Sequence, residues 1–313
     1  METFWIVLLI VIILLIISIF AVSLYAYFQA FYNKNKKLKD ITLLSNGSFT
    51  DEEINVINSL YAEIVEEEYE KVCINAYDGL KLNARYYEFN QDAPLQIMFH
   101  GYKSDGLRDF VGGMKLAKSV GHNVLLVEQR GHGDSKTSTI TLGTVEKYDC
   151  LEWVKYAVDR FGCDKKIILV GVSMGASTIL MASEYKMPSN VVGIVADSPF
   201  SSPADIIKKV MKENKISPKL IFPFVKFGAL IYGGFVLTEK GAVDAVKNAK
   251  IPVLIIHGDI DTFVPTYMSK EIYYNCASKK ELHIFKGADH VRSYFADPQR
   301  YEQIINGFLN SIL

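Results

Sequence analysis

Six short apolar runs recur along the chain from residue 95 onward, and most of them are rich in β-branched residues. They cover residues 95–99, 123–127, 166–170, 191–195, 251–256 and 281–285. Between them lie stretches with helical periodicity, such as residues 147–161 and 176–185. Runs this short and this continuously apolar are typical of strands that are buried on both faces. Strand and helix in regular alternation predict an α/β fold, in which helices cover both faces of a mostly parallel sheet.

Two further β-rich segments precede these runs. Residues 69–76 and 80–89 are joined by a short turn at Tyr77, Asp78 and Gly79. This pattern predicts an antiparallel hairpin at one edge of the sheet. Open α/β sheets place their chemistry at the carboxyl ends of the strands, so candidate functional residues are sought there.

The N-terminus is much more apolar than the rest of the chain. Residues 4–28 are interrupted only by Ser18 and Ser23, and a helix of this length reaches about 37 Å, beyond the roughly 30 Å of a bilayer core. A transmembrane anchor is therefore predicted over residues 1–29. A cleavable signal peptide is the alternative, because residues 21–23 fit a small-x-small cleavage site. However, no Lys or Arg precedes the run, and it exceeds the usual signal core of about 7–15 residues.

Charges beside the run predict how it is oriented. Only Glu2 precedes it, whereas four lysines follow directly, at positions 34, 36, 37 and 39. The positive-inside rule places the following domain in the cytoplasm, with an exported domain as the alternative. Residues 30–68 are interpreted as a neck that spaces the domain from the bilayer. The neck ends in an acidic amphipathic helix over residues 51–69, capped by Thr50 or Asp51.

The remaining composition excludes several classes of partner. The 34 Lys and Arg residues balance 35 Asp and Glu residues, so bulk charge does not favour nucleic acid. Four cysteines lie far apart, without the spacing of a metal site or a disulfide framework, and are predicted to be buried thiols (Cys73, Cys150, Cys163 and Cys276). Neither a metal nor another cofactor is expected.

A G-x-S-x-G sequence follows one of the predicted strands and leads into a predicted helix; it comprises residues 171–175. Its two glycines permit a cramped strand-to-helix turn that exposes the hydroxyl of Ser173 beside a helix amino end. Five such residues alone could be an ordinary glycine-rich turn. The preceding strand and following helix favour a nucleophile.

A serine nucleophile needs a base and an orienting carboxylate. Asp261 follows the strand at 251–256, and His290 follows the strand at 281–285. The order Ser, Asp, His is that of α/β-hydrolases. Asp259 and Asp289 are rivals for the acid, but Asp259 is expected to support its turn and Asp289 to point away from its neighbour His290. Asp261 is therefore preferred.

Two main-chain N–H groups are candidates for an oxyanion hole. One belongs to Met174, directly after the serine, and the other to Tyr102, in a loop that would otherwise be a simple glycine turn. The other histidines, at positions 100, 122, 132, 257 and 283, lack metal-ligand spacing, and those at strand ends are interpreted as loop supports.

With these residues assembled, the chain resembles the α/β-hydrolase superfamily, in particular serine aminopeptidase S33-like and monoglyceride-lipase-like hydrolases, including membrane-anchored bacterial members. The resemblance covers about residues 70–313 and rests on motifs at residues 100–104, 130–135, 171–175, 251–258, 261–265 and 287–290. It implies Ser173 as nucleophile, Asp261 as acid, His290 as base, and Tyr102 and Met174 as oxyanion donors. Glu128 departs from the family pattern, which often has Asp there, and this puts the packing of the following loop in question.

The connection between the strands at 191–195 and 251–256 is unusually long. The resemblance implies a cap at this point, over about residues 201–249 of a domain that spans residues 69–313. Its apolar residues between 220 and 237 could line an acyl pocket over Ser173 or simply bury themselves against the sheet. A second membrane span is disfavoured because Lys226 and Pro223 interrupt the segment and a span would disrupt the sheet.

The predicted activity is hydrolysis of carboxylic esters through an acyl-enzyme, with lipid-like substrates favoured by the anchor and the cap. The same triad would serve a peptidase or a thioesterase. A membrane-bound binding module without catalysis is the alternative from another class. Dehalogenase chemistry is disfavoured, because it needs a carboxylate where Ser173 stands. The expected partners are a small ester or acyl substrate and the membrane.

Overall fold

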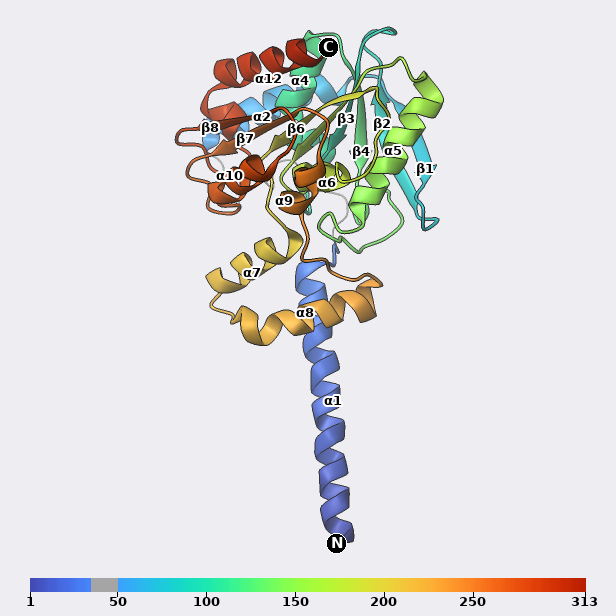
Figure 1. Cartoon of the computed structure of the whole chain (residues 1–313), viewed down its shortest axis with the longest axis vertical. Coiled ribbons are helices and arrows are strands. Elements are labelled where there is room, and N and C mark those ends of the chain that lie inside the picture. The colour runs from blue at the N-terminus through green and yellow to red at the C-terminus, as the bar shows by residue number, and fades with distance from the viewer. Residues whose placement is uncertain (35–49) are drawn as a thin grey trace.

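An eight-stranded sheet forms the centre of the protein, in the computed structural model, which describes residues 1–34 and 50–313 (Figure 1). The strands lie in the order β1-β2-β4-β3-β5-β6-β7-β8. The six predicted strands are all present: β3 (Leu95–Phe99), β4 (Asn123–Glu128), β5 (Ile167–Val172), β6 (Val191–Asp197), β7 (Val253–Gly258) and β8 (Lys280–Phe285). These six pair in parallel, so the predicted α/β class is confirmed. The prediction that β8 is buried is wrong, because it lies at the edge of the sheet and only its Phe285 is buried.

The predicted hairpin is also present at one edge of the sheet. It consists of β1 (Glu70–Asn75) and β2 (Lys81–Tyr87), which pair antiparallel. β2 is also antiparallel to β4, so β1 again runs in the direction of the main sheet. Gly79 lies in the turn at φ +80°, a conformation that favours glycine.

Helices cover both faces of the sheet. One face carries α5 (Glu146–Phe161), α6 (Met174–Ala182), α9 (Ala242–Ala245) and α10 (Thr266–Asn275). The other carries α2 (Asp51–Val65), α3 (Gly106–Asp109), α4 (Val111–Ser119), α11 (Ser293–Ala296) and α12 (Pro298–Ile312). Neighbouring residues of β3 show the effect: Ile97 packs in the first layer and Met98 in the second. Burial on both faces explains why the strands are continuously apolar.

Helix α2 differs from the predicted neck. Thr50 caps it, and the side chain of Glu53 returns the contact in a capping box. However, Ile57, Leu60 and Ile64 are buried in the same cluster as Met98. The helix is therefore part of the domain, and the prediction that it acts as a spacer is wrong. Its apolar side chains pack against the helices and strands on that face of the sheet, and no local sequence pattern specifies this contact.

Helix α1 (Glu2–Ala30) projects from the domain as a long shaft (Figure 1). Within the described residues, it is the one helix long and apolar enough to cross a membrane. Its side chains are exposed along most of its length, but Ser23, Ala26 and Tyr27 are buried. The lysines at positions 36, 37 and 39, on which the predicted orientation depends, lie outside the described residues.

The C-terminal end of α1 is hydrogen-bonded into the domain. The Tyr27 hydroxyl lies 2.7 Å from Thr139 Oγ1, and the N–H of Ile140 donates to the carbonyl of Phe31 at 2.8 Å. Asn33 Nδ2 donates to the carbonyl of Gly131 at 2.9 Å. The last turn of α1 and the residues after it are therefore an integral part of the fold.

The segment between β6 and β7 forms the predicted insertion. It contains α7 (Pro203–Glu213), α8 (Pro218–Gly233), α9 and a short 3₁₀ turn, Val246–Asn248. Helix α8 lies across α1 (Figure 1). A Cβ on Gly228 would lie 2.4 Å from the carbonyl oxygen of Ser23, so the two backbones approach closely. Apolar side chains of the insertion, among them Phe222, Val225 and Phe235, pack in one cluster with Tyr27 and Phe31 of α1.

The cysteines divide into two classes. Cys150 and Cys276 are buried as predicted, but Cys73 and Cys163 are exposed, which corrects the prediction for those two. Cys73 is on an outward position of the edge strand β1, and Cys163 follows the end of α5. Residues in an edge strand or a turn can be exposed to solvent, whereas residues of the central strands are buried.

This division predicts native-state thiol reactivity. We expect iodoacetamide to modify Cys73 and Cys163 in the folded protein, and Cys150 and Cys276 only after unfolding. Burial raises the pKa of the Cys150 thiol, which further suppresses its reactive thiolate. Peptide mass spectrometry before and after denaturation measures this, and modification of native Cys150 would contradict it.

Candidate active site

Ser173 occupies a sharp turn between β5 and α6. Its backbone is at φ +51° and ψ −114°, an unfavourable conformation for a residue other than glycine. A Cβ on Gly175 would lie 1.9 Å from the carbonyl oxygen of Phe99, and one on Gly171 would lie 2.6 Å from the N of Ala176. Close backbone approach therefore requires both glycines of the motif.

Gly175→Ala is expected to destabilise the protein by about 3 kcal/mol, because the added methyl group collides with a main-chain oxygen. Gly307→Ala is the matched control: this glycine is also helical, in α12, and a Cβ there meets nothing within 4 Å. The control should gain up to about 1 kcal/mol from better helix propensity. Thermal unfolding in detergent measures both variants, and equal melting temperatures would contradict the assignment.

The three predicted triad side chains lie in one hydrogen-bonded chain. His290 Nε2 is 2.9 Å from Ser173 Oγ, and His290 Nδ1 is 2.7 Å from Asp261 Oδ2. Because the carboxylate only accepts, Nδ1 carries the hydrogen and Nε2 accepts from the serine hydroxyl. Val291, next to the histidine, is held at φ +55°, an outlier for a β-branched residue. Such strain is typical of functional loops.

Asp261 is buried and accepts several hydrogen bonds. Its Oδ1 accepts from the N–H groups of Phe263 at 2.9 Å and Val264 at 2.7 Å. Its Oδ2 lies 3.0 Å from His257 Nε2 in addition to the contact with His290. Burial alone would raise the pKa of Asp261, but the hydrogen bonds from the two histidines outweigh it and hold this pKa below its usual range.

Sequence reasoning missed the contact made by His257. The ring is fully buried, with Nδ1 2.6 Å from Ser269 Oγ and Nε2 2.7 Å from the carbonyl of Val264. Its Nε2–H therefore points between that carbonyl and Asp261. The position at a strand end was noticeable in the sequence, but the contact with Asp261 depends on how the following loop turns back.

The two rival carboxylates make other contacts. Asp259 Oδ1 accepts from the N–H of Gly287 at 2.6 Å. Asp289 Oδ1 accepts from the N–H groups of Thr262 at 3.0 Å and His290 at 2.8 Å. Both hold loops together, and in the described part of the chain it is Asp261 that contacts the His290 ring.

The loop after β3 passes close to the serine, since a Cβ on Gly101 would lie 3.5 Å from the Cβ of Ser173. The N–H of Gly101 donates to Asp109 Oδ2 at 2.7 Å, and that of Lys103 donates to His132 Nε2 at 2.9 Å. The Tyr102 N–H lies between them and has no acceptor among the described residues. Met174 begins α6, so its N–H has no partner within the helix. Both N–H groups therefore lack an acceptor among the described residues, and their role as oxyanion donors stays a prediction.

Supporting groups hold this loop. Burial lowers the pKa of His132, so its Nε2 stays neutral and accepts the Lys103 N–H. Asp109 was not identified from the sequence, because only the fold brings α3 to the loop. Glu128, the departure from the family pattern, accepts from the N–H of Asp134 at 2.7 Å. The loop therefore packs around the longer carboxylate.

A cavity of about 530 Å³ extends from Ser173 and His290 between the sheet and the helices α4, α11 and α12. Its lining includes apolar residues, namely Met98, Phe110, Leu116, Val170, Val195, Ile305 and Leu309, and charged residues, namely Lys103, Arg108, Asp109, Asp197, Asp289 and Arg292. The lining contains no residue of 201–249. Of the two alternatives left open for the cap, lining of this cavity is therefore not the one observed; its apolar residues cluster with Tyr27 and Phe31 of α1 and with Met174. In residues 1–34 and 50–313, no group of three His, Cys, Asp or Glu side chains could hold a metal ion.

The Tyr102 side chain connects the oxyanion loop to the N-terminal helix. Its hydroxyl donates to the carbonyl of Ala30 at 2.9 Å. Burial raises the pKa of this hydroxyl well above its usual value, so it stays a donor. The end of α1 therefore touches the residue that carries one of the two N–H groups.

Comparisons with known proteins agree with the fold. Family models described as alpha/beta hydrolase fold and as serine hydrolase (FSH1) match residues 97–221 and 177–292. The YqkD protein of Bacillus subtilis is 25% identical over 229 residues, which cover 72% of this chain and 75% of that protein. The lysophosphatidylserine lipase ABHD12 of Danio rerio is 26% identical over 213 residues, 64% of this chain and 52% of that protein.

Among solved structures, an esterase of Pyrococcus furiosus superposes with a TM-score of 0.65 at 25% identity. The superposition covers 85% of this chain and 95% of the esterase. These matches support the superfamily, while the resemblance to its S33-like branch stays a prediction. The sheet order, the strained serine turn and the two family models together identify the chain as an enzyme of the α/β-hydrolase superfamily.

Proposed function

We propose that this protein is a membrane-anchored serine hydrolase that cleaves carboxylic esters of lipid-like substrates through an acyl-enzyme. The observation that supports it most is the hydrogen-bonded chain from Asp261 through His290 to Ser173. The open Tyr102 and Met174 N–H groups beside that chain provide the second element that acyl transfer needs.

The reaction follows from these positions. His290 Nε2 takes the proton of Ser173 as Oγ attacks the ester carbonyl, and Asp261 stabilises the imidazolium. The Tyr102 and Met174 N–H groups bind the negative oxygen. The alcohol leaves with the proton from His290, and the acyl group stays on Ser173. Water then attacks the acyl carbon as its proton passes to His290. The bond from the acyl carbon to Ser173 Oγ breaks, His290 returns the proton to Oγ, and the carboxylic acid leaves.

The cavity and the relatives favour an apolar acyl group. A volume of about 530 Å³ with many apolar lining residues suits a chain or aromatic acyl group. The Danio rerio relative is a lysophosphatidylserine lipase and the Pyrococcus furiosus protein an esterase. Nothing in the site specifically favours a peptide or a thioester.

A fluorophosphonate probe tests the proposal directly. We expect the wild-type protein to be labelled, with the adduct on the peptide that contains Ser173. Relative kcat/KM values for p-nitrophenyl esters, acyl-CoAs and aminoacyl anilides should rank the esters first. Absence of labelling would favour a non-catalytic membrane module, and preference for an anilide or an acyl-CoA would replace the ester by a peptide or a thioester.

Val170→Phe is expected to shift the preference toward short acyl chains. Val170 is on β5 and faces the cavity, so a phenyl ring there occupies space for about three methylenes. At about 0.8 kcal/mol for each, the kcat/KM ratio of laurate to butyrate ester should fall about 50-fold. Val158→Phe on α5, outside the cavity, is the control. An unchanged ratio would mean that the chain binds elsewhere.

We also propose that α1 remains attached as a single membrane span, with the catalytic domain in the cytoplasm. Contacts of Phe20 and Ser23 with α8 favour retention, because cleavage after Ser23 would remove both residues, whereas Tyr27 and Phe31 would stay with the domain. The mass of the purified protein should include Met1 or Glu2. An epitope after Leu313 should resist protease until spheroplasts are permeabilised, and digestion before that would favour an exported domain.

A further inference from the structure

Helix α8 carries apolar side chains on two opposite faces. Phe222, Val225 and Ala229 are buried toward the domain and α1. The other face is exposed or half-exposed and is called here the α8 stripe; it comprises Leu220, Pro223, Phe224, Phe227, Leu230 and Ile231. Leu220, Leu230 and Ile231 are 66%, 50% and 48% exposed. Their spacing of three or four residues places the stripe along one side of the helix. Soluble proteins rarely expose such a continuous apolar surface without a partner.

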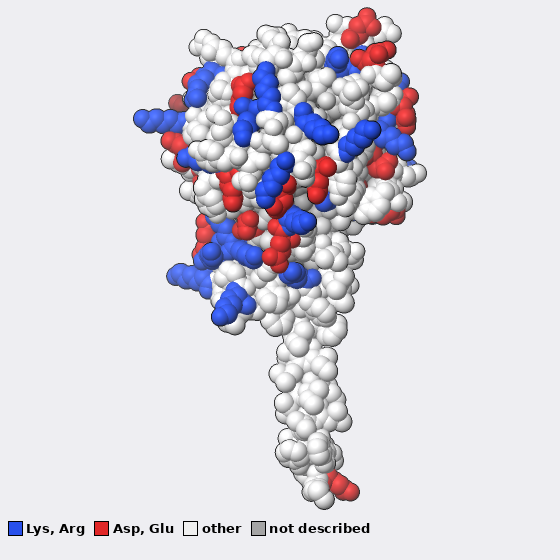
Figure 2. Space-filling model, viewed as in Figure 1, with Lys and Arg blue, Asp and Glu red and all other residues white. Residues whose placement is uncertain are grey.

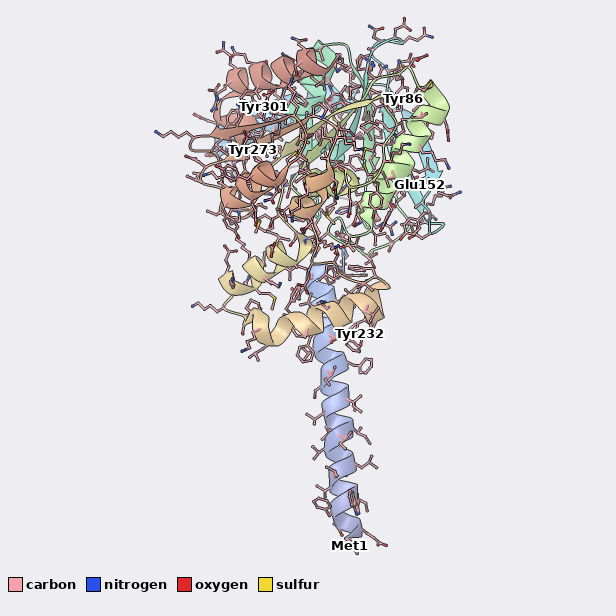
Figure 3. The ribbon with its side chains drawn as sticks, in the orientation of Figure 1. Met1, Tyr86, Glu152, Tyr232, Tyr273 and Tyr301 are labelled. Carbon is pink, nitrogen blue, oxygen red and sulfur yellow. The ribbon has the colours of Figure 1, made fainter. Side chains whose placement is uncertain are left out.

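The contacts with α1 place this stripe at a definite level of a bilayer. A hydrocarbon core of about 30 Å needs about 20 helical residues, so a span that starts after Glu2 ends near Val22. α8 contacts α1 at this height: the Phe227 and Phe20 rings are 5.4 Å apart, and the Tyr232 hydroxyl donates to the carbonyl of Phe20 at 3.1 Å. Figure 3 shows Tyr232 beside α1, with the side chains of the free shaft below it. α8 therefore lies at the boundary between acyl chains and headgroups.

The charges around α8 suit a lipid surface. Residues 203–233 contain six lysines and two carboxylates. Lys208 and Lys226 pair with Glu239, whereas Lys212, Lys215 and Lys219 are exposed and have no ion-pair partner among the described residues. Figure 2 shows lysines gathered at the level of α7 and α8, above a shaft that is uncharged until its tip. Lysines at this height attract anionic headgroups.

We propose that α7 and α8 form an interfacial membrane-binding surface. The α8 stripe inserts among the acyl chains of the leaflet at which α1 enters the domain, and Lys212, Lys215 and Lys219 contact the phosphates of anionic lipids. The inference rests on the proposed membrane span of α1. It differs from the anchor itself, because the span alone would leave the α8 stripe in water.

This surface also reaches the rim of the active site. Lys209 Nζ of α7 donates to the carbonyl of Thr262, and the ammonium lies 5.6 Å from the centre of the Phe263 ring. The Phe263 ring is in turn 5.1 Å from that of His290. Insertion of α8 therefore holds the mouth of the cavity close to the leaflet that would supply a lipid ester.

Depth-dependent fluorescence tests the insertion in the full chain. The exposed Cys73 and Cys163 are first replaced by Ser, and Leu230→Cys is then labelled with the environment-sensitive dye NBD. In nanodiscs that hold one chain each, we expect blue-shifted emission and quenching by lipids with a doxyl group near the headgroup. Tyr274→Cys, at a residue of α10 that is 75% exposed, is the control and should keep the emission of a water-exposed dye.

The outcomes separate this proposal from the others. Ile12→Cys reports the span, because that residue is on the free part of α1. Quenching at position 12 with water-like emission at position 230 would refute the α8 proposal and leave the span intact. Blue-shifted emission at position 230 only in discs with two chains would assign the stripe to a second copy and would also refute it. Ester hydrolysis does not enter the measurement, so Ser173→Ala protein should give the same result.

The lysines are tested in the same assay. Replacing phosphatidylcholine by 30% phosphatidylglycerol should increase the quenching at position 230 at least twofold. The triple variant Lys212→Glu, Lys215→Glu and Lys219→Glu should lose this increase. The matched variant Lys155→Glu, on α5 away from the α8 stripe, should keep it. Equal responses of both variants would refute the contact with anionic lipid.

Discussion

Ser173→Ala is expected to lower kcat for ester hydrolysis by about 10⁶-fold, because no acyl-enzyme can form without its hydroxyl. His290 Nε2 then faces a methyl group, and the remaining rate comes from the oxyanion donors and substrate binding. Steady-state hydrolysis of p-nitrophenyl butyrate measures the loss. Fluorophosphonate labelling should disappear in parallel.

Ser183→Ala is the matched control for this variant. Ser183 is also a buried serine, at the end of α6, where its hydroxyl donates to the carbonyl of Leu180. We expect it to keep labelling and kcat within about threefold of wild type, since it is remote from the His290 ring. A Ser173→Ala enzyme with more than a hundredth of the wild-type kcat would assign the nucleophile to another group.

Asp261→Asn is expected to lower kcat by about 10⁴-fold. An amide in place of Oδ2 no longer fixes the hydrogen on Nδ1 of His290, so the ring loses the tautomer that accepts from Ser173. The same change removes the acceptor of the His257 hydrogen. The kcat of purified protein with an unchanged far-UV spectrum is the appropriate readout.

Asp259→Asn and Asp289→Asn are the isosteric comparisons. Each carboxylate accepts main-chain N–H groups but does not contact the His290 ring, so we expect losses of less than about tenfold. If Asp289→Asn were the inactive variant and Asp261→Asn nearly normal, the acid would have to be reassigned.

The strands could be predicted from the sequence because β3 to β7 are buried on both faces, which leaves continuous apolar runs. The triad positions followed from strand ends: parallel strands bring their carboxyl ends to one edge, where Ser173, Asp261 and His290 do lie in contact. Their catalytic roles remain predictions. The strained turn at Ser173 could be predicted because glycine is the residue type that fits at positions 171 and 175.

Other features depend on partners far away in the chain. Nothing local in α2 reveals that Leu60 packs near Met98. The apolar cap residues were equally compatible with a substrate pocket, and their contacts with Tyr27 of α1 decide against it. Asp109 and His257 are close in sequence to the residues that they contact, Gly101 and Asp261, but these contacts depend on how the intervening loops turn back.

The last turns of α1 have a consequence for cleavage of the chain beside the domain. Phe31 is completely buried, and the carbonyl of Ala30 accepts from the Tyr102 hydroxyl. A protease that cut just after this point would separate the catalytic domain from part of its own interior and from a support of its oxyanion loop. Such a cut is expected to inactivate the enzyme. A more soluble form would have to replace the exposed apolar residues of α1 and keep the last turns of this helix.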